Sequence, residues 1–517
     1  MTDSALSREL IDSLLAAHRH GGGDAMELLE THISWVLLTG TAAYKVKKPV
    51  RLPFVDFSSL ERREFFCREE LRLNRRLAPE LYLEVVPITG TPDAPRLEGA
   101  GTPIEFAVKM RRFPQESLLS RVLHDGRLHA EHVDDLAAQV AEFHQHIDRA
   151  AADVSFGSLK CIREQMQENF EFLDRAVSDA ERSSQLDRLR TWSEREFETR
   201  RETFTQRRRD GFIREGHGDM HLGNIILHDG RVVIFDAIEF NEGFRWIDVQ
   251  SDLAFLVMDL EDRGRPDFAR RCLNAYLERT GDYGGLAALP FYLAYRALVR
   301  AKVAGIRFGQ SGLSDDDRAA CRRELHGYLD LAERFTRPPR PVLLITHGVS
   351  GSGKTTGTQR ILETTGAVRV RSDVERKRLL GLSPSDRPDM DQVKTLYSPA
   401  IGARTYERLA QSARAIMEAG HTAIVDATFL KRSHRAAFRR HAKRWGVPFR
   451  ILEFQADEAE LRRRVAERTK TGTDASDADL AVLTEQLAAV EPLNEDERTV
   501  AVTVDPHASE MSIPIQR

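Results

Sequence analysis

Residues 342–356, "VLLITHGVSGSGKTT", join a short apolar run to a turn that contains Gly348, Gly351 and Gly353. Such a run bounded by a glycine-rich turn is typical of a buried strand, and a helical pattern follows it. Further apolar strands are predicted at 367–372, 422–427, 449–454 and 499–504, with helical patterns between them. The alternation predicts a parallel α/β sheet covered on both faces.

The turn carries a complete G-x-x-x-x-G-K-T pattern from Gly348 to Thr355. Glycines let main-chain N–H groups face phosphate oxygens, the following helix adds its positive end, and the lysine reaches the outer phosphates. We expect ATP to bind here, with GTP as the alternative nucleotide, and the Thr355 hydroxyl to bind Mg²⁺. The predicted nucleotide-binding residues are Gly348, Ser350, Gly351, Ser352, Gly353, Lys354, Thr355 and Thr356; Lys354 is also expected to act in catalysis.

Acidic residues end the next two strands. Asp373 follows the second strand, and Arg376 lies one helical turn later. The carboxylate would accept a hydroxyl proton and the arginine would hold an anionic group on the acceptor; the alternative is an aspartate that caps a helix. Asp426 ends the third strand, where it either reaches Mg²⁺ through water or anchors a turn.

Arg464 and Arg468 lie four residues apart in "LRRRVAERTK", next to the segment "TGTDASDAD" at 471–479. A mobile pair of arginines would neutralise charge on the transferring phosphoryl group. The alternative is a solvated basic face of a helix. We predict catalytic roles for both arginines.

A second motif, "HGDMHLGN", occupies residues 217–224. His217 and His221 are spaced as zinc ligands on a helix, but Gly218 and Gly223 disfavour a helix and no glutamate follows the first histidine. A kinase catalytic loop fits better. It needs a carboxylate for the attacking hydroxyl and a metal-binding oxygen five residues later, which are Asp219 and Asn224.

The stretch "IILHDGRVVIFDAIEF", residues 225–240, predicts a hairpin that turns at Asp229–Gly230. Asp236 follows the hairpin and is the predicted second metal carboxylate. Glu239, three residues further on, is expected to add a metal or substrate contact.

Residues 33–52 and 104–113 predict strands of a small sheet-rich lobe. Lys45 is our choice for the nucleotide phosphates, and Lys47 is the alternative because it has the same facing on the strand. Glu70 lies on an apolar helix face, where a carboxylate needs a cationic partner. We therefore pair it with the lysine, with Glu69 as the alternative and a surface salt bridge as the competing interpretation.

Residues 341–506 resemble P-loop kinases of the AAA-33 and zeta-toxin type, and the D-x-x-R and R-x-x-x-R spacings are similar to those of polynucleotide 5′-hydroxyl kinases. The resemblance implies that Asp373 is the base, that Arg376 binds the acceptor, and that Arg464 and Arg468 belong to a lid.

Residues 25–335 resemble the aminoglycoside phosphotransferase and choline kinase branch of the protein-kinase-like fold, through "HGDMHLGN", "FDAIE" and "DVQSDLAFL". The resemblance implies Asp219 as base, Asn224 and Asp236 as magnesium ligands, and a structural role for Asp248 or Asp252. The chain departs from that branch in lacking an evident glycine-rich loop, and "YKVKKPV" is unusually basic. The whole chain resembles the bacterial bifunctional aminoglycoside phosphotransferase/ATP-binding family.

Two domains are therefore predicted, an α+β protein-kinase-like domain at 1–337 and a P-loop α/β domain at 338–517. The first would consist of a small lobe at about 25–117 and a helical lobe at about 118–335, since amphipathic patterns fill 118–210 and 248–335. The boundary is placed in "FTRPPRP", residues 335–341, because its prolines stop a helix.

The formal net charge of -4 indicates no global attraction to nucleic acid or to an anionic membrane. The N-terminus lacks a signal-peptide pattern and no apolar run approaches a membrane span, which predicts a cytoplasmic protein. Cys67, Cys161, Cys272 and Cys321 form no CxxC pair, so we expect buried free thiols.

We predict a bifunctional ATP- and Mg²⁺-dependent phosphotransferase whose acceptors are hydroxyl-bearing small molecules. In the alternatives, the second module is a polynucleotide 5′-hydroxyl kinase or a nucleotide-sugar kinase, one module senses nucleotide to regulate the other, or the protein is an aminoglycoside resistance enzyme. The sequence gives no indication of oligomeric state.

Overall fold

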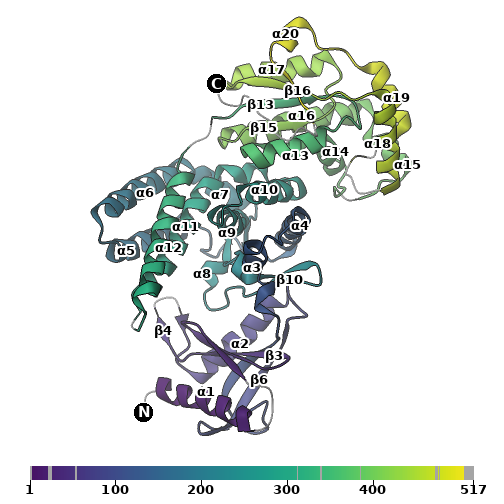
Figure 1. The fold of residues 1–517 in the computed structure, drawn as a ribbon. Helices are drawn as coiled ribbons and strands as arrows, with labels where there is room; N and C mark the ends of the chain where they lie inside the picture. The colour runs from purple at the N-terminus through teal and green to yellow at the C-terminus, as the bar shows by residue number, and fades with distance from the viewer. Residues whose placement is uncertain are drawn as a thin grey trace. The chain divides into compact units, whose positions relative to one another are not determined.

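The computed structural model describes residues 3–20, 26–52, 55–310, 312–337, 340–384, 386–471, 476 and 478–505 (Figure 1). The chain divides into two compact units. The first consists of Met1–Asp135, Glu142–Glu164 and Thr205–Leu256, and the second of Leu136–Ala141, Gln165–Phe204 and Val257–Arg517. Pro338 and Pro339 of the predicted linker, and residues 472–475 and 477 of the segment beside Arg468, lie outside the described residues. The domain boundary at 337/338 stays a prediction.

A six-stranded sheet in the order β1-β2-β3-β8-β6-β7 forms the small lobe of the first unit, and every neighbouring pair is antiparallel. The predicted strands at 33–52 and 104–113 are central to it. The strands are β1 (Glu27–Glu30), β2 (Ser34–Leu38), β3 (Ala42–Lys47), β6 (Tyr82–Thr91), β7 (Ala94–Leu97) and β8 (Pro103–Arg111).

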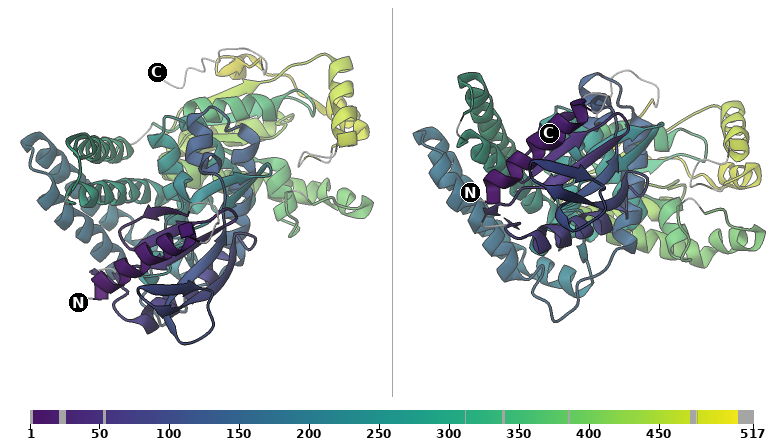
Figure 2. Two further views of the ribbon diagram at one scale, coloured as in Figure 1. Left: turned by 60° about the horizontal axis from the view of Figure 1, so that its bottom comes forward. Right: turned by 90° about the horizontal axis from the view of Figure 1, so that it is seen from below.

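Helices cover the two faces of this sheet. Helix α1 (Asp3–His20) lies across one face, as Figure 2 shows, and its Leu10, Ile11 and Leu14 join the core of that face. Helix α2 (Leu60–Asn74) contributes Cys67 to the core cluster of the other face. Ser59 caps α2 by accepting a hydrogen bond from the Arg62 N–H group. The capped helix packs against β8 and β6 and carries Glu70 and Asn74 among its buried residues.

The remaining elements of the first unit include the hairpin that follows the predicted catalytic loop. The Asp229–Gly230 hairpin is confirmed, since β10 and β11 pair antiparallel and both turn residues have positive φ. The elements are β4 (Arg51–Leu52), β5 (Val55–Asp56), η1 (Gln115–Ser117), α3 (Leu119–His124), β9 (Ile213–Glu215), η2 (Leu222–Asn224), β10 (Ile225–His228), β11 (Arg231–Ile234), α8 (Glu242–Arg245) and β12 (Trp246–Asp248). Helices α4 (Ala130–His146), α7 (Arg201–Arg209) and α9 (Val249–Asp262) have residues in both units.

A five-stranded parallel sheet in the order β14-β15-β13-β16-β17 dominates the second unit. The predicted strands are confirmed as β13 (Leu343–His347), β14 (Val368–Arg371), β15 (Ala423–Asp426), β16 (Phe449–Glu453) and β17 (Ala501–Thr503). Leu344, Ile424 and Leu452 form a core with Ile361 of α13 (Lys354–Thr365). Figure 1 shows α17 (Arg432–Trp445) on the opposite side of the sheet from α13.

The other helices of the second unit are α5 (Leu159–Ala176), whose first residues belong to the first unit, α6 (Ala180–Thr199), α10 (Pro266–Thr280), η3 (Tyr283–Ala287), α11 (Leu289–Phe308), α12 (Asp315–Phe335), α14 (Ser372–Arg378), α15 (Met390–Leu396), α16 (Pro399–Glu418), α18 (Glu458–Thr471), α19 (Leu480–Ala489) and α20 (Glu495–Arg498). Helix α10 packs against α13 and the edge strand β14. Residues upstream of the linker therefore cover one edge of the P-loop sheet.

Two expectations need revision. Cys161 is only half-buried, because it lies in the first turn of α5, whereas Cys67, Cys272 and Cys321 are buried free thiols as predicted. Helix α1 and strands β1, β6 and β7 were not predicted.

Within the part of the chain that the structure describes, no helix has both the length and the apolar character of a membrane span.

Candidate active sites

The loop 217–224 brings Asp219 and Asn224 together. A 3₁₀ turn, η2, ends at Asn224. The Asn224 amide donates to the Asp219 main-chain oxygen and to the Asp219 carboxylate Oδ2, each at a distance of 3.0 Å. The predicted base and the predicted metal-binding amide are thus direct neighbours. These two hydrogen bonds bridge the spacing of five residues between Asp219 and Asn224.

His217 is the structural centre of the loop. Its Nε2 donates to the Phe235 carbonyl at 2.9 Å, and its Nδ1 accepts from the Asp219 N–H group at 3.2 Å. Both ring nitrogens are therefore bonded to main chain, which fixes the neutral tautomer. Burial lowers the pKa of His217 and keeps the ring uncharged. The histidine orients the peptide that carries Asp219.

Asp252 on α9 fastens the same loop from beneath. Its Oδ2 and Oδ1 accept from the N–H groups of His217 and Gly218 at 2.7 and 3.0 Å. A Cβ at Gly216 would lie 2.6 Å from Asp252 Oδ2, so only glycine allows this approach. Asp248 instead pairs with Arg207 through two hydrogen bonds. Both aspartates of "DVQSDLAFL" are anchored in the protein.

The hairpin β10–β11 places Asp236 beside Asn224. The Phe235 N–H group donates to the Asn224 carbonyl at 2.9 Å, and Asp236 comes next with φ of 65°, an unusual conformation for a non-glycine residue. Asn74 Oδ1 accepts from the Ala237 N–H group at 2.8 Å and Tyr82 Oη from the Asp236 N–H group at 3.3 Å. These contacts hold the strained turn in place.

The two candidate lysines share Glu70. Lys45 Nζ lies 2.8 Å from Glu70 Oε1 and 2.6 Å from Asp236 Oδ1, and its side chain is 14% exposed. Lys47 Nζ lies 2.7 Å from Glu70 Oε2, contacts Glu239, and is 0% exposed. Lys45 therefore reaches Asp236, the predicted metal-binding aspartate, whereas Lys47 is enclosed. Glu69, the alternative to Glu70, pairs with Arg72 and Arg245 instead.

The ionisation of this cluster follows from its charges. Burial alone would raise the pKa of the Glu70 carboxyl, but Lys45 and Lys47 outweigh burial and lower that pKa to about 2. Burial would lower the pKa of Lys45, but Asp236, Glu70 and Glu239 raise it well above its ordinary value. Lys45 and Glu70 are both charged at neutral pH. Glu239, predicted as a metal or substrate contact, is buried with its carboxylate on Lys47.

The loop 348–355 of the second unit has the backbone that its glycines allow. Gly348, Gly351 and Gly353 have φ of 150°, 84° and 87°. A Cβ at Gly348 would lie 2.6 Å from the Phe454 carbonyl oxygen and 2.8 Å from Ser352 Oγ, so a larger residue would not fit. Gly353 is the N-cap of α13. The loop therefore directs the positive end of α13 towards the space that its residues line.

Thr355 and Asp426 meet at the carboxyl end of the sheet. The Thr355 hydroxyl donates to Asp426 Oδ2 at 3.1 Å. Asp426 ends β15, which pairs with β13, and Thr355 lies in the first turn of α13, the helix that follows β13. A hydroxyl and a carboxylate held side by side form the type of oxygen donor set that Mg²⁺ prefers. The predicted metal residues of this half are thus adjacent.

Asp373 and Arg376 also contact each other. Both lie on α14, and Arg376 donates to Asp373 Oδ1 at 3.0 Å. Arg371 is the N-cap of this helix, so Asp373 is in its first turn and does not cap it. The Arg376 guanidinium lies 4.8 Å from the centre of the Tyr397 ring. These contacts fix the direction of the arginine.

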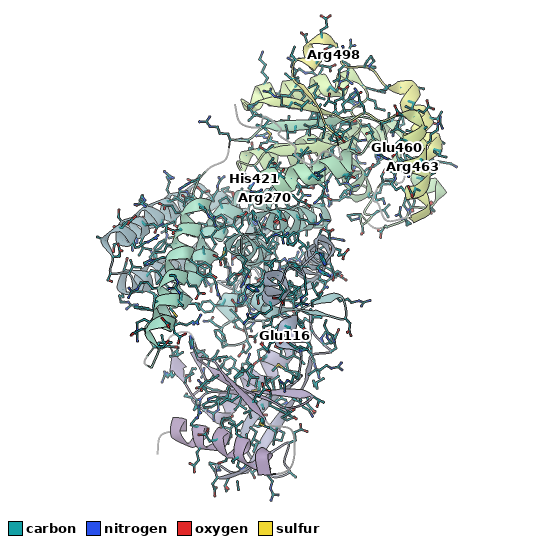
Figure 3. The ribbon with its side chains drawn as sticks, in the orientation of Figure 1. Glu116, Arg270, His421, Glu460, Arg463 and Arg498 are labelled. Atoms are coloured by element: carbon teal, nitrogen blue, oxygen red, sulfur yellow. The ribbon has the colours of Figure 1, made fainter. Side chains whose placement is uncertain are left out.

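The predicted lid arginines come from α18. Arg464 is bonded to Glu460 Oε1 at 2.6 Å and approaches the Gly351 carbonyl at 3.4 Å, while Arg468 donates to the Ala478 carbonyl at 2.7 Å. Figure 3 shows Glu460 and Arg463 extending from this helix. Hydrogen bonds from Arg463 and Arg464 lower the pKa of Glu460 to about 2. Arg464 is therefore held against the phosphate loop by a charged partner.

One cavity of about 510 Å³ brings these second-unit residues together. Its volume is in the range of small-molecule sites. The predicted residues that line it are Ser350, Gly351, Gly353, Lys354, Thr355, Thr356, Asp373, Arg376, Asp426, Arg464 and Arg468. Gly348 and Ser352, also predicted to bind nucleotide, are not among the residues that line it.

Several residues of these sites were missed. Asn74 follows Glu70 by four residues on α2, so the same helix face could have indicated it. Tyr82, Tyr397, Tyr406 and Gln486 carry no local motif, and only the fold brings them to the sites.

Comparison with known proteins identifies both halves. The APH model, described as the phosphotransferase enzyme family, matches residues 54–289, and the AAA_33 model, described as an AAA domain, matches residues 343–493. The uncharacterized proteins Rv2004c of Mycobacterium tuberculosis and Mb2027c of Mycobacterium bovis are each 31% identical over 433 residues, which are 83% of this chain and 84% of theirs. The chain belongs to their family.

This family member joins an APH domain of protein-kinase-like fold to an AAA_33 P-loop kinase domain, and it is an ATP-dependent phosphotransferase. Among solved structures, an amicoumacin kinase is 14% identical over 63% of this chain and 95% of its own, with a TM-score of 0.40. A gluconokinase from Sinorhizobium meliloti 1021 is 24% identical over 33% and 85%, with a TM-score of 0.22. With scores this low, neither structure bears on the substrate.

Proposed function

We propose that this APH/AAA_33 protein has two ATP- and Mg²⁺-dependent sites, each of which transfers the terminal phosphoryl group to a hydroxyl of a small molecule. The observation that carries the proposal is the second-unit cavity. It is lined by a phosphate loop with Lys354, by the Thr355–Asp426 pair and by the Asp373–Arg376 pair. A nucleotide, a metal and an acceptor thus each have suitable residues in one space.

In the second unit, Asp373 accepts the proton of the attacking hydroxyl, and Arg376 holds an anionic group of the acceptor. Lys354, Arg464 and Arg468 stabilise negative charge as the phosphoryl group moves. Thr355 and Asp426 would hold Mg²⁺, which would neutralise phosphate charge when bound. Positioning and electrostatics provide most of the catalysis.

In the first unit, Asp219 is the proposed base, and Asn224 with Asp236 would hold the metal. Lys45, oriented by Glu70, contacts the nucleotide phosphates, since it is the lysine beside Asp236. The enclosed position of Lys47 favours an anchoring role for Glu239 in place of the metal contact predicted from the sequence.

The acceptor chemistry is proposed from Arg376 and the size of the cavity. A guanidinium beside the base favours an acceptor with a carboxylate or phosphate group. Tyr397 and Tyr406 also line the cavity, and aromatic rings of this kind stack on bases. A nucleoside or an oligonucleotide 5′ end is therefore the second candidate acceptor. A cytoplasmic location stays a prediction from the sequence.

A substrate screen on the full chain tests the proposal. Wild type, Asp219→Asn and Lys354→Ala would be incubated with ATP, Mg²⁺ and libraries of hydroxy acids, sugar phosphates, nucleosides and oligonucleotides, and products read by the mass of one added phosphoryl group. Each variant should lose one class of product and keep the other.

Matched controls are Asp229→Asn, whose carboxylate is 91% exposed on the hairpin turn, and Lys443→Ala on the outer surface of α17. Both should behave as wild type. If the same products persist in Asp219→Asn and in Lys354→Ala, the two-site proposal fails. If one unit yields no product from any acceptor yet alters the rate of the other, that unit is a nucleotide sensor.

A further inference from the structure

Gln486 connects α19 to the phosphate loop. Its Oε1 accepts a hydrogen bond from the Ser350 N–H group at 2.7 Å, although the two residues are separated by 136 positions in the chain. Its side chain lines the same cavity as Lys354 and Thr355. A glutamine from a distant helix is thus bonded to an amide of the loop that holds phosphate.

Apolar packing fixes this position. Leu483, one helical turn before Gln486, is 0% exposed and packs in a cluster with Val349, Leu461 and Val465, and Leu487 packs against the same cluster. Val349 is the residue before Ser350. Asp479 caps the start of α19 by accepting from the Val482 N–H group. The apolar face of α19 therefore packs against the loop, and this packing positions Gln486.

The contact lies where the outer phosphates are expected. The lysine of a phosphate loop reaches the β- and γ-phosphates. Here Lys354 Nζ donates to the Val349 carbonyl at 2.7 Å, so its ammonium group is next to the Val349–Ser350 peptide. The metal pair Thr355–Asp426 lies at the start of α13. Gln486 and the Lys354 ammonium group therefore contact the same part of the loop, the Val349–Ser350 peptide.

A glutamine amide has one acceptor oxygen and an amino group with two donors on the same carbon. With the oxygen bonded to the Ser350 N–H group, the amino group supplies the hydrogen-bond donors of this cavity-lining side chain. We propose that the Gln486 amino group donates a hydrogen bond to the terminal phosphate of the bound nucleotide, so that α19 distinguishes a triphosphate from a diphosphate. The inference rests on the proposed nucleotide site and adds a residue that reads the phosphate number.

The test is Gln486→Glu in the full chain. Glutamate keeps an oxygen for the Ser350 N–H group but replaces the amino donor with a second oxygen, which repels phosphate. Binding of ADP and of a non-hydrolysable ATP analogue would be measured by equilibrium dialysis with Mg²⁺. The share of binding that Lys354→Ala abolishes is assigned to this loop.

ATP-analogue affinity should fall at least about tenfold in Gln486→Glu, the equivalent of one charge-assisted hydrogen bond, while ADP affinity changes less than about threefold. Gln486→Leu should show the same direction with a smaller loss. Thr484→Ala, an exposed change on the same helix, should bind both nucleotides as wild type does.

The outcomes separate the two levels of inference. If Lys354→Ala abolishes no nucleotide binding, the proposed function of this site fails, and the inference fails with it. If Lys354→Ala abolishes binding but Gln486→Glu shifts ADP and the ATP analogue equally, or shifts neither, the nucleotide site stands. Gln486 is then only a structural contact of α19, and the inference is overturned.

Discussion

The guanidinium group of Arg369 donates a hydrogen bond to the main-chain carbonyl of Thr355 at a distance of 2.9 Å. Arg369 is only 4% exposed, and its Nε is paired with Glu278 of α10 at 2.8 Å. One buried arginine thus links a helix upstream of the linker to the first turn of α13, which carries the predicted magnesium hydroxyl.

Glu278→Ala should destabilise the second unit, because it leaves the Arg369 guanidinium buried without its carboxylate. Breaking a buried pair from one side costs about 3–5 kcal/mol. Urea unfolding of the full chain would measure it. Arg271→Ala is the matched control, since the Arg271–Glu363 pair also ties α10 to the P-loop half, through α13, but is more exposed; its loss should cost about 1 kcal/mol or less. Equal losses in the two variants would contradict the buried-pair account.

Replacement of the two lysines of β3 should have different effects. Lys47→Met leaves Glu239 and one oxygen of Glu70 buried beside an apolar chain, so the free energy of unfolding should fall by about 3 kcal/mol or more. Lys45→Met should raise the KM for ATP at the first site with a smaller loss of stability, because Asp236 is partly exposed. A larger loss of stability in Lys45→Met would reverse the proposed assignment.

Asp252→Asn should loosen the loop that carries Asp219. An amide offers one acceptor oxygen where the carboxylate offers two, so the N–H group of His217 or of Gly218 would face an amino donor. We expect a loss of about 1–3 kcal/mol and faster hydrogen exchange at those two amides, read by mass spectrometry of the loop peptide. Unchanged exchange there would show that Asp252 does not hold the loop.

Acid should destabilise the second unit through His421. Burial lowers the pKa of His421 from 6.5 to about 4, and its Nε2 has no hydrogen-bond partner among the described residues (labelled in Figure 3). Below pH 6.5 the unfolded chain binds the proton more readily than the folded chain. The stabilisation is therefore complete above pH 6.5 and is lost as the pH falls towards 4, a difference of about 3 kcal/mol.

Thermal unfolding of wild type and His421→Gln between pH 7 and pH 4 checks this. The variant should show a shallower loss of Tm in acid, whereas His124→Gln, at an exposed histidine, should follow wild type. Parallel curves for all three proteins would exclude His421 as the titrating group.

Local motifs made part of both sites predictable. Asp219 and Asn224 lie five residues apart in one loop, and residues 348–355 form another, so residues that are close in the sequence are also close in space. Thr355 and Asp426 were predictable as neighbours because the carboxyl ends of parallel strands share one edge.

Contacts that join distant segments were not predictable. Strand alternation gave Lys45 and Lys47 the same facing, and only the positions of Glu239 and Asp236 distinguish them. Strand β6 was missed because Pro87 and two irregularities in its pairing with β8 interrupt the pattern. Gln486 and Arg369 act through Ser350 and Glu278, which lie 136 and 91 positions away in the chain, and no local pattern indicates such partners.

Strand β14 is the outer strand of the P-loop sheet, and the N–H and carbonyl groups of Arg369 would otherwise be open there. They are bonded to Asn274 Oδ1 at 2.7 Å and to the Tyr283 hydroxyl at 3.4 Å, both upstream of the linker. A fragment that starts at the prolines of the linker would lack Asn274 and Tyr283. Its sheet would have an unprotected edge strand, which is prone to aggregate by strand addition.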